Sequence, residues 1–516
     1  MNRLKKFILN GSILTLSSLL LRMVGVSFNV YISNTIGAEA MGLFTLISTV
    51  YSFAVTLATS GINLATTKLV SEALGELSSK KQDGKGSVAS VMRACVIYSL
   101  IFSVTASVLL YLLAEPISIA ILKDRRCILS LKLFSLSLVP ISLSSVICGY
   151  FSAVRKVYKN AISQIAEQLV RIISSIFLLS GFFASDVESA CVCIVLGGTI
   201  SEMISFVIRG LDYLREKRSL KSNPSPIKYE KKLLGIALPL AFSAYVRSAL
   251  ITIEHILIPR GLERSGASRD RALAAYGTVQ SMVFPIIFFP SAILSSFASL
   301  LVPELSQASA QNNKRDIQRI VSNVFEAALI FGIGCAGVMI SFSFALGDII
   351  YPASDAGDYI KLIAPLIPIM YLDTSVDSML KGLGEQVYSM GVNIIDSSLS
   401  VILVLILLPR YGIYGYILTV YFTETVNAAL SIARLLSVSK IKPLVSKRVF
   451  RPLLAIIIST FFSRYFPISR LLFISSDPLA LIFDISETVT VYLLLLFLFG
   501  SLRVEKIKKG IDLVKK

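Results

Sequence analysis

The chain has 516 residues, of which 54% are hydrophobic and 16% are charged, and its mean hydropathy is +0.75. Apolar runs of about 20 residues, long enough to cross a bilayer as a helix, recur from end to end and exclude a soluble globular protein. The sequence has no regular pattern of short alternating strands, and helices satisfy their own backbone hydrogen bonds in lipid. We therefore predict an all-α polytopic membrane protein.

Fourteen apolar segments are predicted to be transmembrane helices, joined by short loops. They lie approximately at residues 9–33, 40–67, 88–114, 128–151, 161–183, 189–208, 233–258, 272–303, 320–346, 362–380, 387–408, 413–433, 452–473 and 480–502. No hydrophilic interval is long enough for a soluble domain.

The basic residues are distributed unevenly between the two sides of these spans. With both termini on one side, and with basic residues near the ends of spans counted with the nearest loop, that side holds 35 of the 50 Lys and Arg residues and the opposite side holds 12. Basic loops favour the cytoplasm, so both termini are predicted to be cytoplasmic in a multi-pass cell-membrane protein. The net charge of +18 then indicates contact with anionic lipids and not with nucleic acid. Two outer loops, Lys123–Arg126 and Arg260–Arg271, break the trend.

The two halves of the chain resemble each other. "GSILTLSSLLLR" (Gly11–Arg22) and "GIALPLAFSAYVR" (Gly235–Arg247) each open with glycine and place an arginine 11 or 12 residues later. This pattern predicts two six-helix lobes related by a pseudo-two-fold axis along the membrane normal, with a substrate path between them, plus two extra helices. The expected divisions are an N-lobe at 1–213, a cytoplasmic linker at 214–232, a C-lobe at 233–440, and the last two spans with a basic tail at 441–516.

Arg22 lies near the middle of the first span, where an arginine costs roughly 2.5–3.5 kcal/mol on insertion scales. Polar or small residues recur around it every three or four positions and form one helix face: Thr15, Ser18, Arg22, Gly25, Asn29 and Ser33. Arg247 has a similar setting, with Ser243 before it and Glu254 after it. Because the guanidinium fork suits phosphate and carboxylate, the two arginines predict an anion-binding cavity. The alternative is a structural arginine paired with an acidic residue.

Arg171 differs, because Glu167 precedes it by four residues in the favourable orientation for an intrahelical ion pair. A self-contained ion pair is the simpler interpretation, although Arg171 could also border the cavity as a third substrate-binding residue.

Acidic residues within spans are candidates for ion binding or proton relay. Asp373 and Asp377 share a helix face; they form a candidate carboxylate pair or, alternatively, sit at a wet helix end and pair with Lys381. A second candidate ion-coupling set combines residues of three spans: Glu254, Asn393, Asp396 and Thr423. No cofactor and no firm metal site are expected, and the sequence has no P-loop. Na⁺ and H⁺ are therefore the candidate coupling ions.

Several phrases resemble the stage V sporulation protein B family. They are Gly11–Glu72, "ISQIAEQLVRI" (Ile162–Ile172), Ile258–Ala308 and "MLKGLGEQVYSM…LLPRYGIYGYI" (Met379–Ile417), in the family's order. The family belongs to the multidrug/oligosaccharidyl-lipid/polysaccharide exporter superfamily. The resemblance implies two six-helix lobes and movement of an undecaprenyl-pyrophosphate-linked sugar, in this branch a lipid II-like peptidoglycan precursor for the spore cortex.

The same resemblance assigns a function to Arg22. Related lipid II flippases carry a functional arginine in an Arg-x-x-Gly motif of the first span, which "RMVG" with Gly25 matches. They have a second basic residue where this chain has Phe28, and an arginine in the eighth span that this chain lacks. We expect Arg247 to substitute, and the exact cargo stays open.

The sequence thus predicts a flippase that works by alternating access, and not an enzyme. Alternatives are a cation-coupled multidrug exporter of the same fold, a flippase for another polysaccharide repeat unit, a membrane enzyme acting on lipid-linked sugars, or a scaffold that recruits cell-wall synthesis proteins. The outer loops are too short for the catalytic loop such an enzyme needs.

Overall fold

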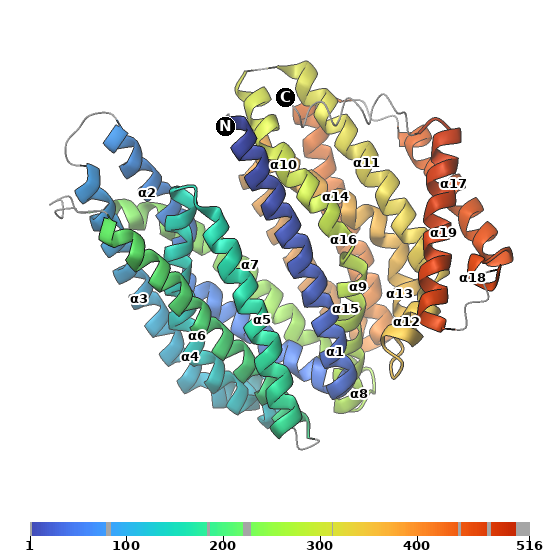
Figure 1. The fold of residues 1–516 in the computed structure, drawn as a ribbon. Helices are drawn as coiled ribbons and strands as arrows, with labels where there is room; N and C mark the ends of the chain where they lie inside the picture. The colour runs from blue at the N-terminus through green and yellow to red at the C-terminus, as the bar shows by residue number, and fades with distance from the viewer. Residues whose placement is uncertain are drawn as a thin grey trace. The chain divides into compact units, whose positions relative to one another are not determined.

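The computed structural model describes residues 3–78, 84–182, 186–219, 229–311, 313–441, 445–471 and 476–501. Within these ranges almost every residue is helical and there is no β-strand (Figure 1). The chain is therefore an all-α polytopic membrane protein, as the sequence predicted.

The first half of the chain consists mostly of long helices. They are α1 (Arg3–Thr59), α2 (Ile62–Ser78), α3 (Gly84–Pro116), the π-helix η1 (Ile117–Leu122), the 3₁₀-helix η2 (Arg125–Cys127), α4 (Ile128–Ala153), α5 (Val157–Phe182), α6 (Val187–Ser219) and α7 (Glu230–Arg264).

The second half is more interrupted. Its helices are α8 (Arg269–Gly277), the π-helix η3 (Thr278–Val283), α9 (Phe284–Phe288), α10 (Ser291–Ala310), α11 (Lys314–Ser341), α12 (Ser343–Ile350), α13 (Ala356–Ile363), the 3₁₀-helix η4 (Ala364–Leu366), α14 (Ile367–Gly382), α15 (Gln386–Tyr411), α16 (Ile413–Ser439), α17 (Val445–Tyr465), α18 (Ile468–Leu471) and α19 (Asp477–Leu498).

The described part of each of the fourteen predicted spans falls mainly on one helix or on consecutive helices. Among the described residues, 11 helical segments are long and apolar enough to cross a membrane. The first of these, Leu20–Leu74, contains most of the first two predicted spans. Two predicted spans are not among the 11: the segment 272–303, which is divided among α8, η3, α9 and α10, and the segment 413–433, which lies in α16.

The helix α1 consists of two helices that meet at Gly37. The backbone there has φ 81° and ψ 172°, a conformation that is essentially restricted to glycine. Gly37 is also one of the places where the chain passes between its two compact units, because the first unit includes residues up to Ala38 and the second begins at Glu39.

The described residues form two compact units. Unit 1 comprises those within Met1–Ala38, Gly261–Ser268 and Ala275–Lys516, and unit 2 comprises those within Glu39–Arg260 and Arg269–Ala274. The first part of α1 therefore packs with helices of the second half of the chain, and most of α7 packs with helices of the first half. These contact-based units differ from the lobes at 1–213 and 233–440, which stay a prediction based on the sequence repeat.

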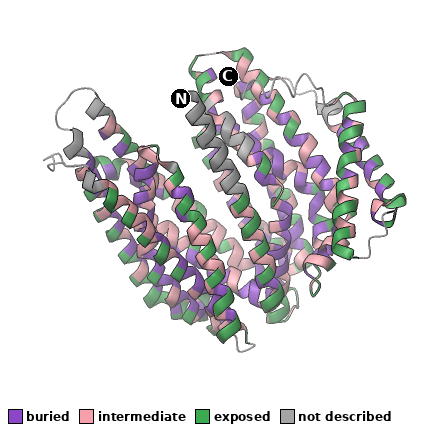
Figure 2. Cartoon of the chain, in the orientation of Figure 1, coloured by how far each residue is buried: buried purple, intermediate pink, exposed green. Residues whose placement is uncertain are grey.

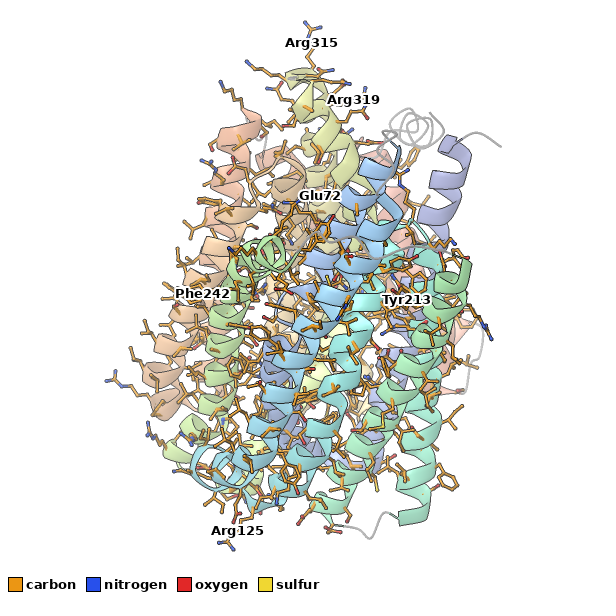
Figure 3. The ribbon with its side chains drawn as sticks, turned by 90° about the vertical axis from the view of Figure 1, so that its left-hand side faces the viewer. Glu72, Arg125, Tyr213, Phe242, Arg315 and Arg319 are labelled. Atoms are coloured by element: carbon orange, nitrogen blue, oxygen red, sulfur yellow. The ribbon has the colours of Figure 1, made fainter. Side chains whose placement is uncertain are left out.

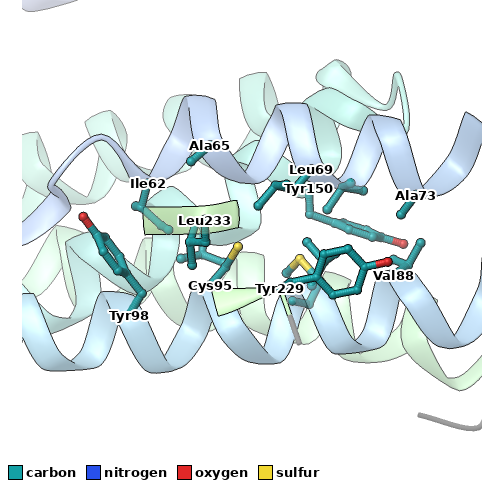
Figure 4. Packing of buried hydrophobic residues seen from close by; sticks show 14 of the residues in the cluster. Ile62, Ala65, Leu69, Ala73, Val88, Cys95, Tyr98, Tyr150, Tyr229 and Leu233 are labelled. Atoms are coloured by element: carbon teal, nitrogen blue, oxygen red, sulfur yellow. The ribbon is translucent and has the colours of Figure 1, made fainter. Parts of the chain in front are cut away.

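The core of unit 2 explains why α7 belongs to it. Buried residues of α2 and α3 pack together, among them Leu69 and Cys95, and Tyr150 of α4 joins them. Leu233 of α7 and Tyr229, just before that helix, fill the same cluster (Figure 4). Burial of this apolar surface fixes α7 in unit 2.

The last two predicted spans pack within unit 1. Ile456 of α17 and Tyr492 of α19 form a buried cluster with Ile333 of α11, and the Tyr492 hydroxyl donates to the carbonyl of Ile330 at 2.7 Å. Large apolar side chains on the other faces of these two helices are exposed, for example Phe461 and Leu494, as Figure 2 illustrates for the helices as a whole. Such exposure is expected of helices that face lipid.

Candidate functional site

Arg22 lies on the first part of α1 and contacts the interrupted helix that follows η3. Its guanidinium Nη2 donates to the carbonyl of Phe288 at 2.9 Å and to the hydroxyl of Ser291 at 3.4 Å. Seven residues further along α1, the amide of Asn29 donates to the carbonyl of Ser281. Two residues of the predicted polar face, Arg22 and Asn29, therefore bond to the segment 281–291, whereas the side chains of Thr15 and Ser18 lie outside the described residues.

Prolines make this backbone available. Pro285 has no N–H, so the carbonyl of Ser281 cannot receive the ordinary helical bond from the residue four positions on. Near the second break, at Pro290, the N–H of Ala292 donates to Phe289 and not to Phe288. The carbonyl of Phe288 is thus open to side chains, and carbonyls without a backbone donor need such partners.

The two arginines predicted to bind an anion are each without a carboxylate partner in the described part of the chain. The acceptors of Arg22 are neutral oxygens, and its relative exposure is intermediate. Arg247 lies exposed on α7, and no hydrogen bond or ion pair to it occurs among the described residues. Arg22 belongs to unit 1 and Arg247 to unit 2, so their convergence on one cavity stays a prediction. Gly25 lies on the same helix as Arg22 and is partly buried.

Arg171 forms the predicted ion pair and extends it. Its Nη2 lies 3.5 Å from Glu167 on the same helix and 3.6 Å from Glu202 on α6. Glu167 also pairs with Arg209 at 3.3 Å, and the hydroxyl of Tyr51 donates to Glu202 at 2.7 Å. Two arginines and two glutamates therefore neutralise each other within unit 2.

A pocket of about 470 Å³ adjoins this network. Glu167, Glu202 and Arg209 line it, together with hydroxyl, amide and thiol side chains from α1, α2, α4 and α5. The sequence analysis identified Glu167 but not the pocket, because the wall of the pocket combines five helices that are far apart in sequence. The polar residues within these apolar spans were the available signal.

The candidate carboxylate pair lies in unit 1 and has unequal surroundings. Asp377 pairs with Lys381 at 2.5 Å and accepts a bond from the hydroxyl of Ser389. Asp373 accepts a bond at 3.0 Å from the amide of Asn427, while its second oxygen is buried without a hydrogen-bond partner in the described structure. The Asp377–Lys381 pair agrees with the alternative in which these aspartates lie at a solvated helix end and pair with Lys381. The carboxylate oxygen without a hydrogen-bond partner belongs to Asp373.

The second candidate ion-coupling set is divided. Asn393 and Asp396 lie on α15 and Thr423 on α16, all in unit 1, whereas Glu254 lies on α7 in unit 2. Asn393 donates to the carbonyl of Ser389 on its own helix at 2.8 Å. Within the described ranges, no group of three or more His, Cys, Asp or Glu side chains is arranged to hold a metal ion.

The two basic outer loops that broke the charge trend form one ion-pair cluster in unit 2. Arg126 contacts Glu39 at 2.7 Å, buried Asp124 at 2.8 Å and Asp270 at 3.9 Å. Arg269 lies 3.9 Å from Asp124 and donates to the carbonyl of Leu122. Charged residues of the two loops thus contact each other and hold the loops together. Counting basic residues alone could not predict these contacts.

Fold and site define a polytopic helical membrane protein that carries charged groups within its spans. The family model described as "Polysaccharide biosynthesis protein" matches residues 7–309, so the chain belongs to that family. A second model, "MatE", matches residues 266–406.

Individual proteins support this assignment. Stage V sporulation protein B of Bacillus subtilis (strain 168) is 24% identical over 98% of this chain and 98% of its own length. Lipid II flippase MurJ of the same organism is 22% identical over 73% of each chain. A solved structure, lipid II flippase MurJ in an inward closed conformation, has a TM-score of 0.72 and 15% identity, covering 94% of this chain and 98% of that one. The resemblance to the stage V sporulation protein B family is confirmed.

Proposed function

We propose that the chain is a flippase that moves an undecaprenyl-pyrophosphate-linked sugar across the cytoplasmic membrane by alternating access. The observation that carries the proposal is Arg22, a permanent cation in a membrane span whose hydrogen-bond partners, among the described residues, are neutral oxygens. A guanidinium within a membrane span favours a negatively charged partner, and its planar fork matches the oxygens of a pyrophosphate. The names of the relatives, a sporulation protein and lipid II flippases, support a lipid-linked glycan as cargo.

The finer assignments belong to the same proposal. The cargo is a peptidoglycan precursor, used for the spore cortex, and the protein is a transporter and not an enzyme. Arg22 with Gly25 and Asn29 forms one side of the substrate site; Arg247 supplies the second cation and Arg171 borders the cavity. Both termini face the cytoplasm, where the basic loops meet anionic lipids.

Ion coupling is proposed at Asp373. One of its oxygens accepts a bond from Asn427 and the other is buried and open, so a proton or Na⁺ would complete its coordination. Burial, the negative charges of Asp377 and Asp396, and the nearby hydroxyl of Ser431 all act on the same carboxylate. The set formed by Glu254, Asn393, Asp396 and Thr423 is the alternative coupling site.

A cation-coupled multidrug exporter is the second candidate function, favoured by the MatE match over residues 266–406. The two candidates differ in the charge of the cargo. Two uncompensated arginines attract an anionic headgroup, whereas an exporter of cationic drugs needs acidic residues in its cavity.

Native mass spectrometry of the gently purified full chain tests the proposal. We expect a bound undecaprenyl-pyrophosphate glycan with the wild-type chain. Loss of a charge-assisted contact is worth about 1.5–3 kcal/mol, so Arg22→Gln and Arg247→Gln should each lower its occupancy about tenfold or more. Arg434→Gln is the matched control, because Arg434 pairs with Glu385 at 2.9 Å. Equal occupancy in all variants would contradict the anion site, and co-purified cationic compounds would favour the exporter.

A further inference from the structure

The pocket of unit 2 is not used by the proposed anion site. Its wall is formed by the second part of α1 together with α2, α4, α5 and α6. The volume of about 470 Å³ is within the range of small-molecule sites. We propose that this pocket binds a neutral, hydroxylated ligand, namely a sugar ring of the glycan headgroup; this inference rests on the proposed function.

The charges around the pocket are balanced. Glu167 is shared by Arg171 and Arg209, and Glu202 is held by Arg171 and Tyr51. Two carboxylates and two guanidiniums leave no formal excess of either sign. A pocket with this balance has little preference for a phosphate or for a cation, which distinguishes it from Arg22 and from Asp373.

The remaining polar lining suits hydroxyl groups. Six hydroxyl or amide side chains line the pocket: Ser52, Thr59, Asn63, Ser144, Ser145 and Gln164. Hydroxyls and amides both donate and accept hydrogen bonds, as sugar hydroxyls require. Four of these side chains, Asn63, Ser144, Ser145 and Gln164, have no hydrogen-bond partner among the described residues.

Ser144 is the buried and unpaired hydroxyl of this polar lining. Its side chain is 3% exposed, and its hydroxyl oxygen has no hydrogen-bond partner in the described structure. A buried hydroxyl without a partner destabilises the protein, so its presence in a polar pocket is explained if a ligand hydroxyl bonds to it.

Cys148 provides a native probe, because its thiol also lines the pocket and is partly exposed. The full chain in nanodiscs is alkylated with N-ethylmaleimide, and the labelling of each cysteine is followed by peptide mass spectrometry. Cys335 of unit 1, also partly exposed, is the internal control. The added probes are the neutral disaccharide N,N′-diacetylchitobiose, inorganic pyrophosphate and Na⁺.

We expect the disaccharide to slow alkylation of Cys148 and not of Cys335, with no effect of pyrophosphate or Na⁺. Ser144→Ala should weaken this protection by roughly two- to tenfold, as expected for one neutral hydrogen bond. It should leave thermal stability unchanged or higher, since the variant removes an unpaired buried hydroxyl.

Absence of protection by the disaccharide would overturn the proposal, as would equal or stronger protection by pyrophosphate or Na⁺. The lipid that co-purifies with the chain is measured independently of Cys148. Failure of the sugar pocket can therefore be separated from failure of the flippase proposal.

Discussion

Arg22 carries a permanent charge within a predicted membrane span, and its hydrogen-bond partners among the described residues are neutral. Phe288 and Ser291 orient the side chain without neutralising it. The positioned guanidinium is then available to an anion, and the orientation is obtained without a competing carboxylate. This separation of positioning from neutralisation is what a reversible anion site requires, because the anion must also leave.

Substitutions of Arg22 test whether the two parallel N–H donors of its guanidinium matter in addition to its charge. Lysine keeps the charge of Arg22 but cannot present two parallel donors, so we expect Arg22→Lys to lower transport of a lipid-linked glycan in proteoliposomes by about tenfold. Arg22→Gln, which keeps donors for Phe288 and loses the charge, should lower it further. Full activity of the lysine variant would show that charge alone matters, and full activity of both would contradict a substrate role.

Arg126 has the opposite character, because carboxylates surround it. Its guanidinium holds both oxygens of buried Asp124, so Arg126→Ala leaves a buried carboxylate with weaker partners. We expect the unfolding free energy in mixed detergent to fall by about 1–3 kcal/mol. Arg125→Ala is the matched control, since the neighbouring Arg125 is exposed and lies at one end of the helices (Figure 3). Equal effects of the two variants would contradict the ion-pair cluster.

Whether a contact in the site could be predicted depends on how far apart its residues lie along the sequence. The polar face of the first span and the Arg171–Glu167 pair follow from helix periodicity, and both were predicted. The acceptors of Arg22 were not, because they exist only where prolines interrupt a helix 266 residues away. The unit 2 pocket was not predicted either, since it depends on how five helices pack.

At the scale of an element, Gly37 determines the shape of α1. Its backbone lies in a glycine-only region, and a Cβ there would meet no atom within 4 Å, so substitution is opposed by backbone strain and not by crowding. We expect Gly37→Ala to lower the unfolding free energy by about 1–3 kcal/mol. Gly210→Ala in α6, where there is also open space but an ordinary helical backbone, should be neutral or stabilising. Unchanged stability of Gly37→Ala would indicate that the bend relaxes.

The helical fold was easier to predict from the sequence than the division of the chain into unit 1 and unit 2. Hydropathy identified fourteen helical segments, because burial in lipid requires long apolar runs. It did not predict that the first part of α1 joins unit 1 and most of α7 joins unit 2. Loops and repeats suggest lobes that are continuous in sequence, whereas the packing of Leu233 against α2 and α3 assigns α7 to the first half.

At the scale of the whole molecule, the charge distribution predicts one orientation in the membrane. The predicted side of both termini holds 35 of the 50 basic residues, and three arginines predicted on the other side contact carboxylates or carbonyls: Arg126, Arg260 and Arg269. In the predicted orientation these three arginines lie on the outer side against the general trend, and their contacts with carboxylates and carbonyls offer a structural reason for that placement.

Labelling of single introduced cysteines tests this orientation in intact cells. Arg125→Cys, at the outer ion-pair cluster, should react with a membrane-impermeant maleimide added outside. Arg215→Cys, near the end of α6 and with a side chain that is 78% exposed in the parent, should react only after permeabilisation. The parent chain measures the background of its own six cysteines, four of which are buried. The reverse labelling pattern would place both termini outside and contradict the predicted orientation. The anionic headgroup would then reach Arg22 from the opposite side of the membrane.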